Sequence, residues 1–251
     1  MKRNQETVRA ARNDKKQENG RRIKDKFSKQ REERRNTSPL VAMNESQKEY
    51  IRLLREKDMV IATGLAGTSK TYIPTVMACD DYSAGNVDKI YITRPNVSNS
   101  KSLGYFGGDL VEKMSNWLLP VLSIMNERLG AGEVECGIRN GNITFVPFEV
   151  IKGMSFNRAW VIGDEMEDCN YDEVKKFVTR LGTDIKCAIA GDISQSELKD
   201  KSGLRTLIEL RDRRDYLKEK VGHVDFNRPS DIVRSEQCKE WILAFRDFEG
   251  E

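Results

Sequence analysis

The sequence predicts an α/β fold, in which helices cover a mostly parallel β-sheet. Short apolar runs of strand length recur between residues 59 and 226, each bounded by Gly, Asp, Asn or Pro. Helix-like stretches separate most of these runs, and this alternation is typical of parallel strands joined by crossover helices. The runs are Met59–Thr63, Lys89–Thr93, Ile143–Val146, Ala159–Gly163, Ile185–Ala190 and His223–Phe226, and helices are expected at 44–56, 70–80, 109–129, 171–181, 203–219 and 236–247.

Residues 1–38 differ from the rest of the chain in composition. They hold 14 Lys and Arg against 6 Asp and Glu, a net charge of +8, which leaves a net charge of −5 for residues 39–251. Such a polar segment cannot bury enough apolar surface to offset its ordering entropy. We expect a disordered or partly helical basic arm at 1–38, followed by one domain at 39–251. The arm is either a solubilising tail or a segment that binds a polyanion and releases counterions.

Composition argues against several classes of protein. None of the five cysteines forms a C-x-x-C pair, so a zinc ribbon or a disulfide framework is not expected. His223 is the sole histidine, which argues against most metal-hydrolase and Ser-His-Asp schemes. No apolar stretch approaches about eighteen residues, and the basic N-terminus lacks the apolar run of a secretory signal. We therefore expect a cytoplasmic protein, bacterial or, if viral, in the host cytoplasm.

A small hairpin insertion is expected before the fourth apolar run. Asn140-Gly141 lies between two short alternations of polar and apolar residues, at 133–138 and 142–146. An Asn-Gly pair in that setting is typical of a two-residue hairpin turn.

The octapeptide GLAGTSKT follows the first apolar run and precedes an expected helix. Strand, glycine-rich loop and helix are the context in which G-x-x-x-x-G-K-[ST] cradles nucleotide phosphates, with backbone N–H groups and the helix dipole favouring the anion. Lys70 would reach the outer phosphates of ATP, and the Thr71 hydroxyl would complete a Mg²⁺ shell. The nucleotide-binding residues expected here are Gly64, Leu65, Ala66, Gly67, Thr68, Ser69, Lys70 and Thr71.

Ser69 stands where the pattern has its second glycine. If its backbone is right-handed helical, serine fits without strain. If the loop requires a positive φ there, serine costs about 1–2 kcal/mol.

Two further polar groups follow buried strands. Asp164 and Glu165 end the run WVIG, where the first carboxylate would orient the metal and the second would polarise the attacking water. Alternatively, they are ordinary loop acids after a strand. Gln195, after the next strand, would face the same crevice and sense the γ-phosphate. The alternative there is a plain turn in which Asp192 caps a helix.

These elements together resemble the PhoH family of ATPases, which are similar to superfamily-1 helicases built on a single RecA-like core. The resemblance covers residues 40–247 and rests on eight segments in the family's order: GLAGTSKT, ITRPNV, LGYFGGDLVEK, WVIGDEMED, FVTRLG, AIAGDISQSEL, SGL and DIVRS. It implies a RecA-like P-loop NTPase fold. It also implies that Lys70, Thr71, Asp164, Glu165 and Gln195 are the nucleotide and Mg²⁺ residues.

The resemblance implies further roles. Gln47 resembles the upstream glutamine that recognises adenine in helicases, although a surface glutamine on an amphipathic helix is the alternative. Arg234 is the first candidate for an arginine finger, with Arg180 competing across a subunit boundary, because family members are thought to form rings, often hexamers. Either arginine could instead serve a structural ion pair.

A nucleic-acid contact is implied by the segment from ITRPNV onward. Arg94 would contact a phosphate, and Lys101 and Tyr105 would add a charge and a stacking surface for RNA or single-stranded DNA. An ordinary loop between strand and helix is the alternative.

The function implied is Mg²⁺-dependent ATP hydrolysis coupled to RNA or single-stranded DNA in a homo-oligomer. An adaptor that is gated by nucleotide and hardly turns it over is the second hypothesis. A small-molecule phosphotransferase is the third, and the glutamine motifs fit it less well.

Overall fold

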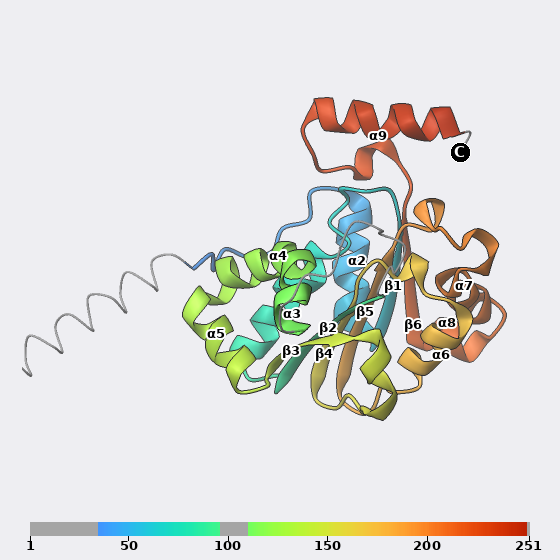
Figure 1. The fold of residues 1–251 in the computed structure, drawn as a ribbon. Helices are drawn as coiled ribbons and strands as arrows, with labels where there is room; N and C mark the ends of the chain where they lie inside the picture. Colours follow the sequence, from blue (N-terminus) through green and yellow to red (C-terminus); the bar gives the residue numbers. More distant parts are fainter. Residues whose placement is uncertain (1–34, 96–109, 250–251) are drawn as a thin grey trace, which may run out of the picture.

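One parallel sheet forms the centre of the protein (Figure 1). The structure is a computed structural model that describes residues 35–95 and 110–249. Within these ranges, six strands lie in the order β3-β2-β4-β5-β1-β6, and every neighbouring pair is parallel. They are β1 (Met59–Gly64), β2 (Lys89–Arg94), β3 (Ile143–Pro147), β4 (Ala159–Gly163), β5 (Ile185–Gly191) and β6 (Val221–Phe226). All six expected strands are confirmed, with ends within two residues.

Helices cover both faces of this sheet, as the α/β prediction requires. One face packs against α2 (Glu45–Glu56), α3 (Tyr72–Ser83), α4 (Leu110–Leu129) and α5 (Ala131–Arg139). The other packs against η1 (Phe148–Gly153), α6 (Tyr171–Val178) and α7 (Gly203–Asp212). Successive residues of β1 divide between the two cores, since Val60 and Ala62 join the first and Ile61 the second. A strand buried on both faces explains why β1 is continuously apolar.

The expected hairpin is wrong, because residues 131–139 form α5 and β3 pairs in parallel with β2. Asn140-Gly141 is the C-terminal stop of this helix. Gly141 has φ 72°, its N–H donates to Ile138 O, and the N–H of Asn142 donates to Gly137 O. These two bonds define a Schellman motif, which needs a left-handed residue just as a hairpin turn does.

The first described residues bond to α4, and the boundary expected at residue 38 stays a prediction. Asn36 donates its N–H to Glu127 O at 2.8 Å, and Arg128 donates to the carbonyls of Asn36 and Ser38. The chain is therefore attached to α4 by residue 36. The rest of the predicted arm, residues 1–34, lies outside the described residues. At the start of α2, Asn44 is the N-cap and accepts from Gln47 N–H.

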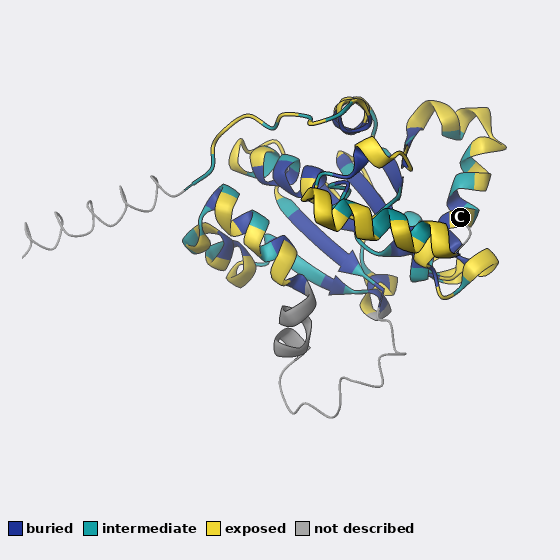
Figure 2. Ribbon diagram, turned by 90° about the horizontal axis from the view of Figure 1, so that it is seen from above, coloured by how far each residue is buried: buried dark blue, intermediate teal, exposed yellow. Residues whose placement is uncertain are grey.

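The last helix lies at the edge of the sheet where the strands end. After β6 the chain passes through η5 (Pro229–Asp231) into α9 (Glu236–Glu249), which stands above the body of the protein in Figure 1 and is exposed along much of its length in Figure 2. The predicted helix at 203–219 is divided into α7 and α8 (Asp215–Lys220). No helix in the described ranges is long and apolar enough to cross a membrane.

Candidate active site

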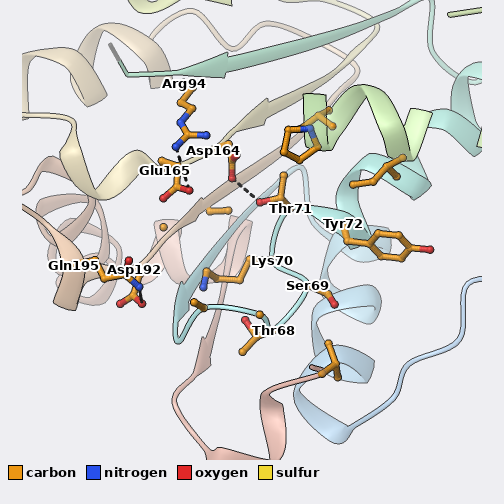
Figure 3. Close-up of a pocket in the computed structure, with 18 of the residues that line it drawn as sticks. Thr68, Ser69, Lys70, Thr71, Tyr72, Arg94, Asp164, Glu165, Asp192 and Gln195 are labelled. Atoms are coloured by element: carbon orange, nitrogen blue, oxygen red, sulfur yellow. Dashed lines mark hydrogen bonds and ion pairs between the residues drawn. The ribbon is translucent and has the colours of Figure 1, made fainter. Parts of the chain in front are cut away.

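A cleft of about 470 Å³ opens at the carboxyl edge of the sheet. Its floor is the glycine-rich loop after β1, and β4 and β5 contribute the polar groups that follow them (Figure 3). The apolar side of the cleft comes from α4, and Arg234 closes it beyond β6. The predicted residues that line it are Ala66, Gly67, Thr68, Ser69, Lys70, Thr71, Arg94, Asp164, Glu165, Gln195 and Arg234.

Two glycines of the loop have positions that a side chain cannot occupy. Gly64 has φ 111°, and a Cβ there would lie 2.4 Å from Phe226 O. Gly67 has φ 74°, and its Cβ would lie 2.7 Å from Cγ of Arg234. The loop is thereby pressed against the end of β6 and the segment that follows it: Leu65 N–H donates to Phe226 O, and Val233 N–H donates to Gly67 O. These contacts hold the loop's shape against β6.

The sequence left two backbone conformations open for Ser69, and the structure shows the strained one. Its φ is 72°, in the left-handed region that disfavours a residue with a Cβ. The loop backbone therefore follows the path that the second glycine of the pattern would take. The serine costs about 1–2 kcal/mol there.

Replacing Ser69 by Gly should stabilise the protein by about 1 kcal/mol, because the relieved strain exceeds the extra entropy of glycine in the unfolded chain. We expect a rise of about 2–4 °C in thermal midpoint, and less than a tenfold change in the Kd of ATP. Ser83→Gly, at the exposed end of α3, is the matched control and should not stabilise. A gain of about a hundredfold in ATP affinity would show instead that the natural loop is impaired.

Lys70 lies in the floor of the cleft. Its Nζ donates to Gly64 O at 2.5 Å and to Leu65 O at 2.7 Å, both within its own loop. Burial lowers the pKa of this ammonium, and the carboxylates of the site, Asp192 foremost, oppose that shift. The ammonium is thus held beside the loop N–H groups, where an anion would gain most from it.

Thr71 and Asp164 form a pair suited to Mg²⁺. The Thr71 hydroxyl donates to Asp164 Oδ1 at 2.5 Å, which brings together a hydroxyl and a carboxylate oxygen, the hard ligands that this ion prefers. Burial raises the pKa of Asp164, and the bond from Thr71 lowers it. The donor set therefore fits a metal held partly by the protein and partly by phosphate and water.

Glu165 is held in a strained conformation beside Arg94. Its φ is 51°, and its Oε1 lies 3.4 Å from Nη2 of Arg94 (Figure 3). The structure thus places Arg94, expected on a nucleic-acid surface, in the nucleotide cleft. Lys101 and Tyr105 lie outside the described residues. A left-handed non-glycine residue is a strain that recurs at functional sites.

Gln195 lies in the cleft, on a short turn that Asp192 caps. It lines the cleft and donates through Nε2 to Asp192 Oδ2 at 2.6 Å. Asp192 also caps η3 (Ile193–Gln195) by accepting from Ser194 N–H. The capping aspartate therefore orients the glutamine toward the cleft.

The structure does not bring Gln47 or Arg180 into the cleft. Gln47 is only 2% exposed; its Nε2 donates to Thr68 O at 3.3 Å and its Oε1 accepts from Met43 N–H at 2.8 Å. Its amide bonds the phosphate loop to α2, and the expected contact with adenine stays a prediction. Arg180 bonds through its carbonyl to Phe156 N–H, ahead of β4 and at the opposite edge of the sheet.

Sequence reasoning missed two parts of the site. Tyr72 and the α4 residues Pro120, Val121 and Ile124 line the cleft without belonging to any motif. Glu167, two residues after Glu165, is buried and accepts from Asp192 N–H next to the cleft, and the D-E-x-E spacing after β4 was the available signal.

A comparison with protein families settles where the chain belongs. Residues 39–246 match the family model described as PhoH-like protein. The chain belongs to the PhoH family. Protein PhoH of Escherichia coli K12 is 34% identical over 215 residues, which cover 84% of this chain and 59% of that protein. The PhoH-like protein of Bacillus subtilis strain 168 is 37% identical over 166 residues, covering 65% of this chain and 52% of that protein.

This PhoH family member thus spans little more than half the length of the curated relatives it matches. Among solved structures, it is similar to the large terminase from the thermophilic bacteriophage D6E. The TM-score is 0.49 at 12% identity, covering 82% of this chain and 50% of that chain. Another crystal form of that terminase is a complex with ADP. The predicted α/β fold, a parallel sheet covered by helices, is confirmed apart from the hairpin.

Proposed function

We propose that this protein is a Mg²⁺-dependent ATPase that couples hydrolysis to binding or remodelling RNA or single-stranded DNA, in the cytoplasm. The supporting observation is the convergence of Lys70, Thr71, Asp164, Glu165 and Gln195 on one cleft from the ends of three strands. They come from positions up to 125 residues apart along the chain, yet each has the chemistry that phosphoryl transfer to water requires.

Each of these residues has a distinct role in the proposed reaction. Loop N–H groups and Lys70 bind the β- and γ-phosphates of ATP, and Thr71 and Asp164 would hold Mg²⁺. The ion, when bound, neutralises charge that develops on the phosphate oxygens. Glu165 polarises the attacking water, which Gln195 helps to orient. Arg234, which already lines the cleft, stabilises the charge on the transferring phosphoryl group.

The link to nucleic acid is supported by the position of Arg94. This arginine pairs with Glu165 and belongs to the segment ITRPNV, which resembles the helicase element that contacts nucleic acid. A phosphate that draws Arg94 away would free Glu165 for water. The same ion pair favours a second candidate, a nucleotide-gated adaptor, in which Glu165 stays paired and turnover is negligible.

Phosphate release from ATP, measured with and without single-stranded RNA, tests this proposal. We expect Mg²⁺-dependent release that RNA stimulates about tenfold or more, because a phosphate on Arg94 weakens its hold on Glu165. Binding of a fluorescent ATP analogue is measured in parallel. Binding without release, with RNA or DNA present, would favour the adaptor, and phosphate transfer to a small metabolite would contradict both.

A further inference from the structure

Helix α9 has an apolar stripe that faces solvent. Trp241, Phe245 and Phe248 are 61%, 57% and 89% exposed, and they recur at the i, i+4 and i+7 spacing of one helical face. The ring centroids of Trp241 and Phe245 lie 5.9 Å apart, so these two side chains form one surface. In Figure 2, α9 is the helix that runs to the C-terminal mark and is exposed along much of its length. A contiguous exposed apolar patch of a few hundred Å² is typical of an interaction site.

The opposite side of α9 attaches the helix to the protein. Ile242 and Leu243 are half-buried, and Arg246 Nη1 donates to Asn227 O at 2.9 Å. These contacts set the orientation of the helix and leave the aromatic stripe on the outside. A surface helix usually turns its apolar stripe toward the core. The reversed orientation of α9 therefore favours a further segment that covers the stripe.

The exposed charges of α9 are mostly acidic. Glu236, Glu240 and Asp247 are exposed, whereas the basic residues Lys239 and Arg246 are half-buried. Lys239 pairs with Glu236 at 3.7 Å, and Arg246 bonds to a backbone carbonyl. The three acids lie at the i, i+4 and i+11 positions, so they share one side of the helix, beside the aromatic stripe.

This charge distinguishes among the partners that an aromatic stripe could bind. RNA or DNA bases would stack on the rings, but the acids repel the phosphates. A membrane surface favours a helix with basic residues on its polar face. A second copy of α9 would bring like charges together. A basic segment with some apolar side chains satisfies both the stripe and the acids.

The chain itself contains a segment of this composition. Residues 1–34, which lie outside the described residues, hold 13 Lys and Arg against 6 Asp and Glu, and among them are Val8, Ile23 and Phe27. Fully extended, this segment spans up to roughly 110 Å, whereas a domain of this size has a radius of gyration of about 17 Å. It can therefore reach α9 from the attachment of residue 36 to α4. Tethering gives it an effective concentration of about 1 mM, which favours the chain's own arm over the arm of another copy.

We propose that residues 1–34 dock on α9 of the same chain. Their apolar side chains cover the aromatic stripe, and their basic residues lie beside Glu236, Glu240 and Asp247. The docked segment lies next to the nucleotide cleft, because α9 begins two residues after the cleft residue Arg234. This docking does not depend on the proposed ATPase function.

Acrylamide quenching of Trp241 fluorescence in the full chain tests the docking. The difference between wild type and Trp241→Phe isolates the signal of this tryptophan. Docking shields the ring, so its quenching constant should be about threefold lower at about 0.1 M salt than at about 1 M, where the Debye length falls from about 10 Å to about 3 Å.

Substitutions in the arm separate docking from a general effect of salt. At low salt, the arm variant should raise the quenching constant by the same factor of about three, because the attraction to the acids of α9 is lost. It replaces four basic residues by Gln, namely Arg21, Arg22, Lys24 and Lys26. The matched control removes four exposed basic residues from α5, η1 and α6 and should leave the constant unchanged; these are Arg139, Lys152, Lys175 and Lys176.

Four outcomes would overturn the inference. Equally strong quenching of Trp241 in all variants and at both salt concentrations would show that the stripe is uncovered. Shielding that neither salt nor the arm variant relieves would show that another part of the protein covers it. Shielding that grows with protein concentration would assign the stripe to a second copy, and shielding that appears only with single-stranded RNA would assign it to nucleic acid.

Discussion

Replacing Glu165 by Gln should lower kcat for ATP hydrolysis by about 10³-fold, the range expected when a general base is removed. Gln has the same shape but lacks the charge that polarises the attacking water. ATP should bind as tightly or more tightly, because a negative charge near the γ-phosphate has been removed. The rate of phosphate release measures kcat, and titration with a fluorescent ATP analogue measures the affinity for nucleotide.

The Glu167→Gln variant is the matched control for this substitution, since it makes the same change two residues further along. A loss of less than about tenfold in kcat at Glu165→Gln would mean that another group positions the water. A parallel loss of ATP binding would mean that Glu165 serves the architecture of the cleft instead of the chemical step.

Replacing Arg234 by Ala should lower kcat by about 10³-fold, which is at the lower end of what arginine fingers contribute elsewhere. Arg234 lines the cleft and its side chain packs on Gly67, so it reaches the phosphate loop within its own subunit. The Kd of ATP should change little, because the guanidinium acts on charge that develops during transfer. Single-turnover hydrolysis separates this effect from product release.

Arg180→Ala is the matched control for the finger. Arg180 lies at the opposite edge of the sheet, so within one subunit its loss should leave kcat within about twofold. If Arg180→Ala is the slower enzyme, a neighbouring subunit provides the finger. Mixing it with Glu165→Gln should then restore part of the activity, because one interface would combine an intact finger with an intact base.

Local chemistry made the strands and the phosphate loop predictable. The four inner strands β1, β2, β4 and β5 are short apolar runs buried on both faces. Asn44 caps α2 through a side chain that accepts from Gln47 N–H, three residues away. The convergence of Lys70, Asp164 and Gln195 followed from the rule that parallel strands end at one edge.

Where the sequence was misread or left a choice open, the local pattern was compatible with two structures. Asn140-Gly141 provides a residue with left-handed φ, which can either end a helix or form a hairpin turn. The helix is favoured because it packs Val134 into the core. For Ser69 a helical and a left-handed conformation were both left open, and the structure shows the left-handed one, with φ 72°. Gln47 has an amide that could pair with a nucleotide base, but in the structure this amide is hydrogen-bonded to the backbone of Thr68 and Met43. These outcomes depend on contacts between segments far apart in the sequence.

The close approach at Gly191 links two positions that lie 24 residues apart in the chain. Wherever an acid or amide of this length occupies position 167, the backbone at 191 has no room for a methyl group. A Cβ at 191 would lie 2.5 Å from Glu167 Oε2, and it would also lie 2.6 Å from Leu204 Cδ2 and 2.9 Å from the backbone N of residue 167, so alanine at 191 would require the segment at 166–168 and α7 to shift away from β5. Replacing Gly191 should therefore loosen the packing of both elements on the end of this strand.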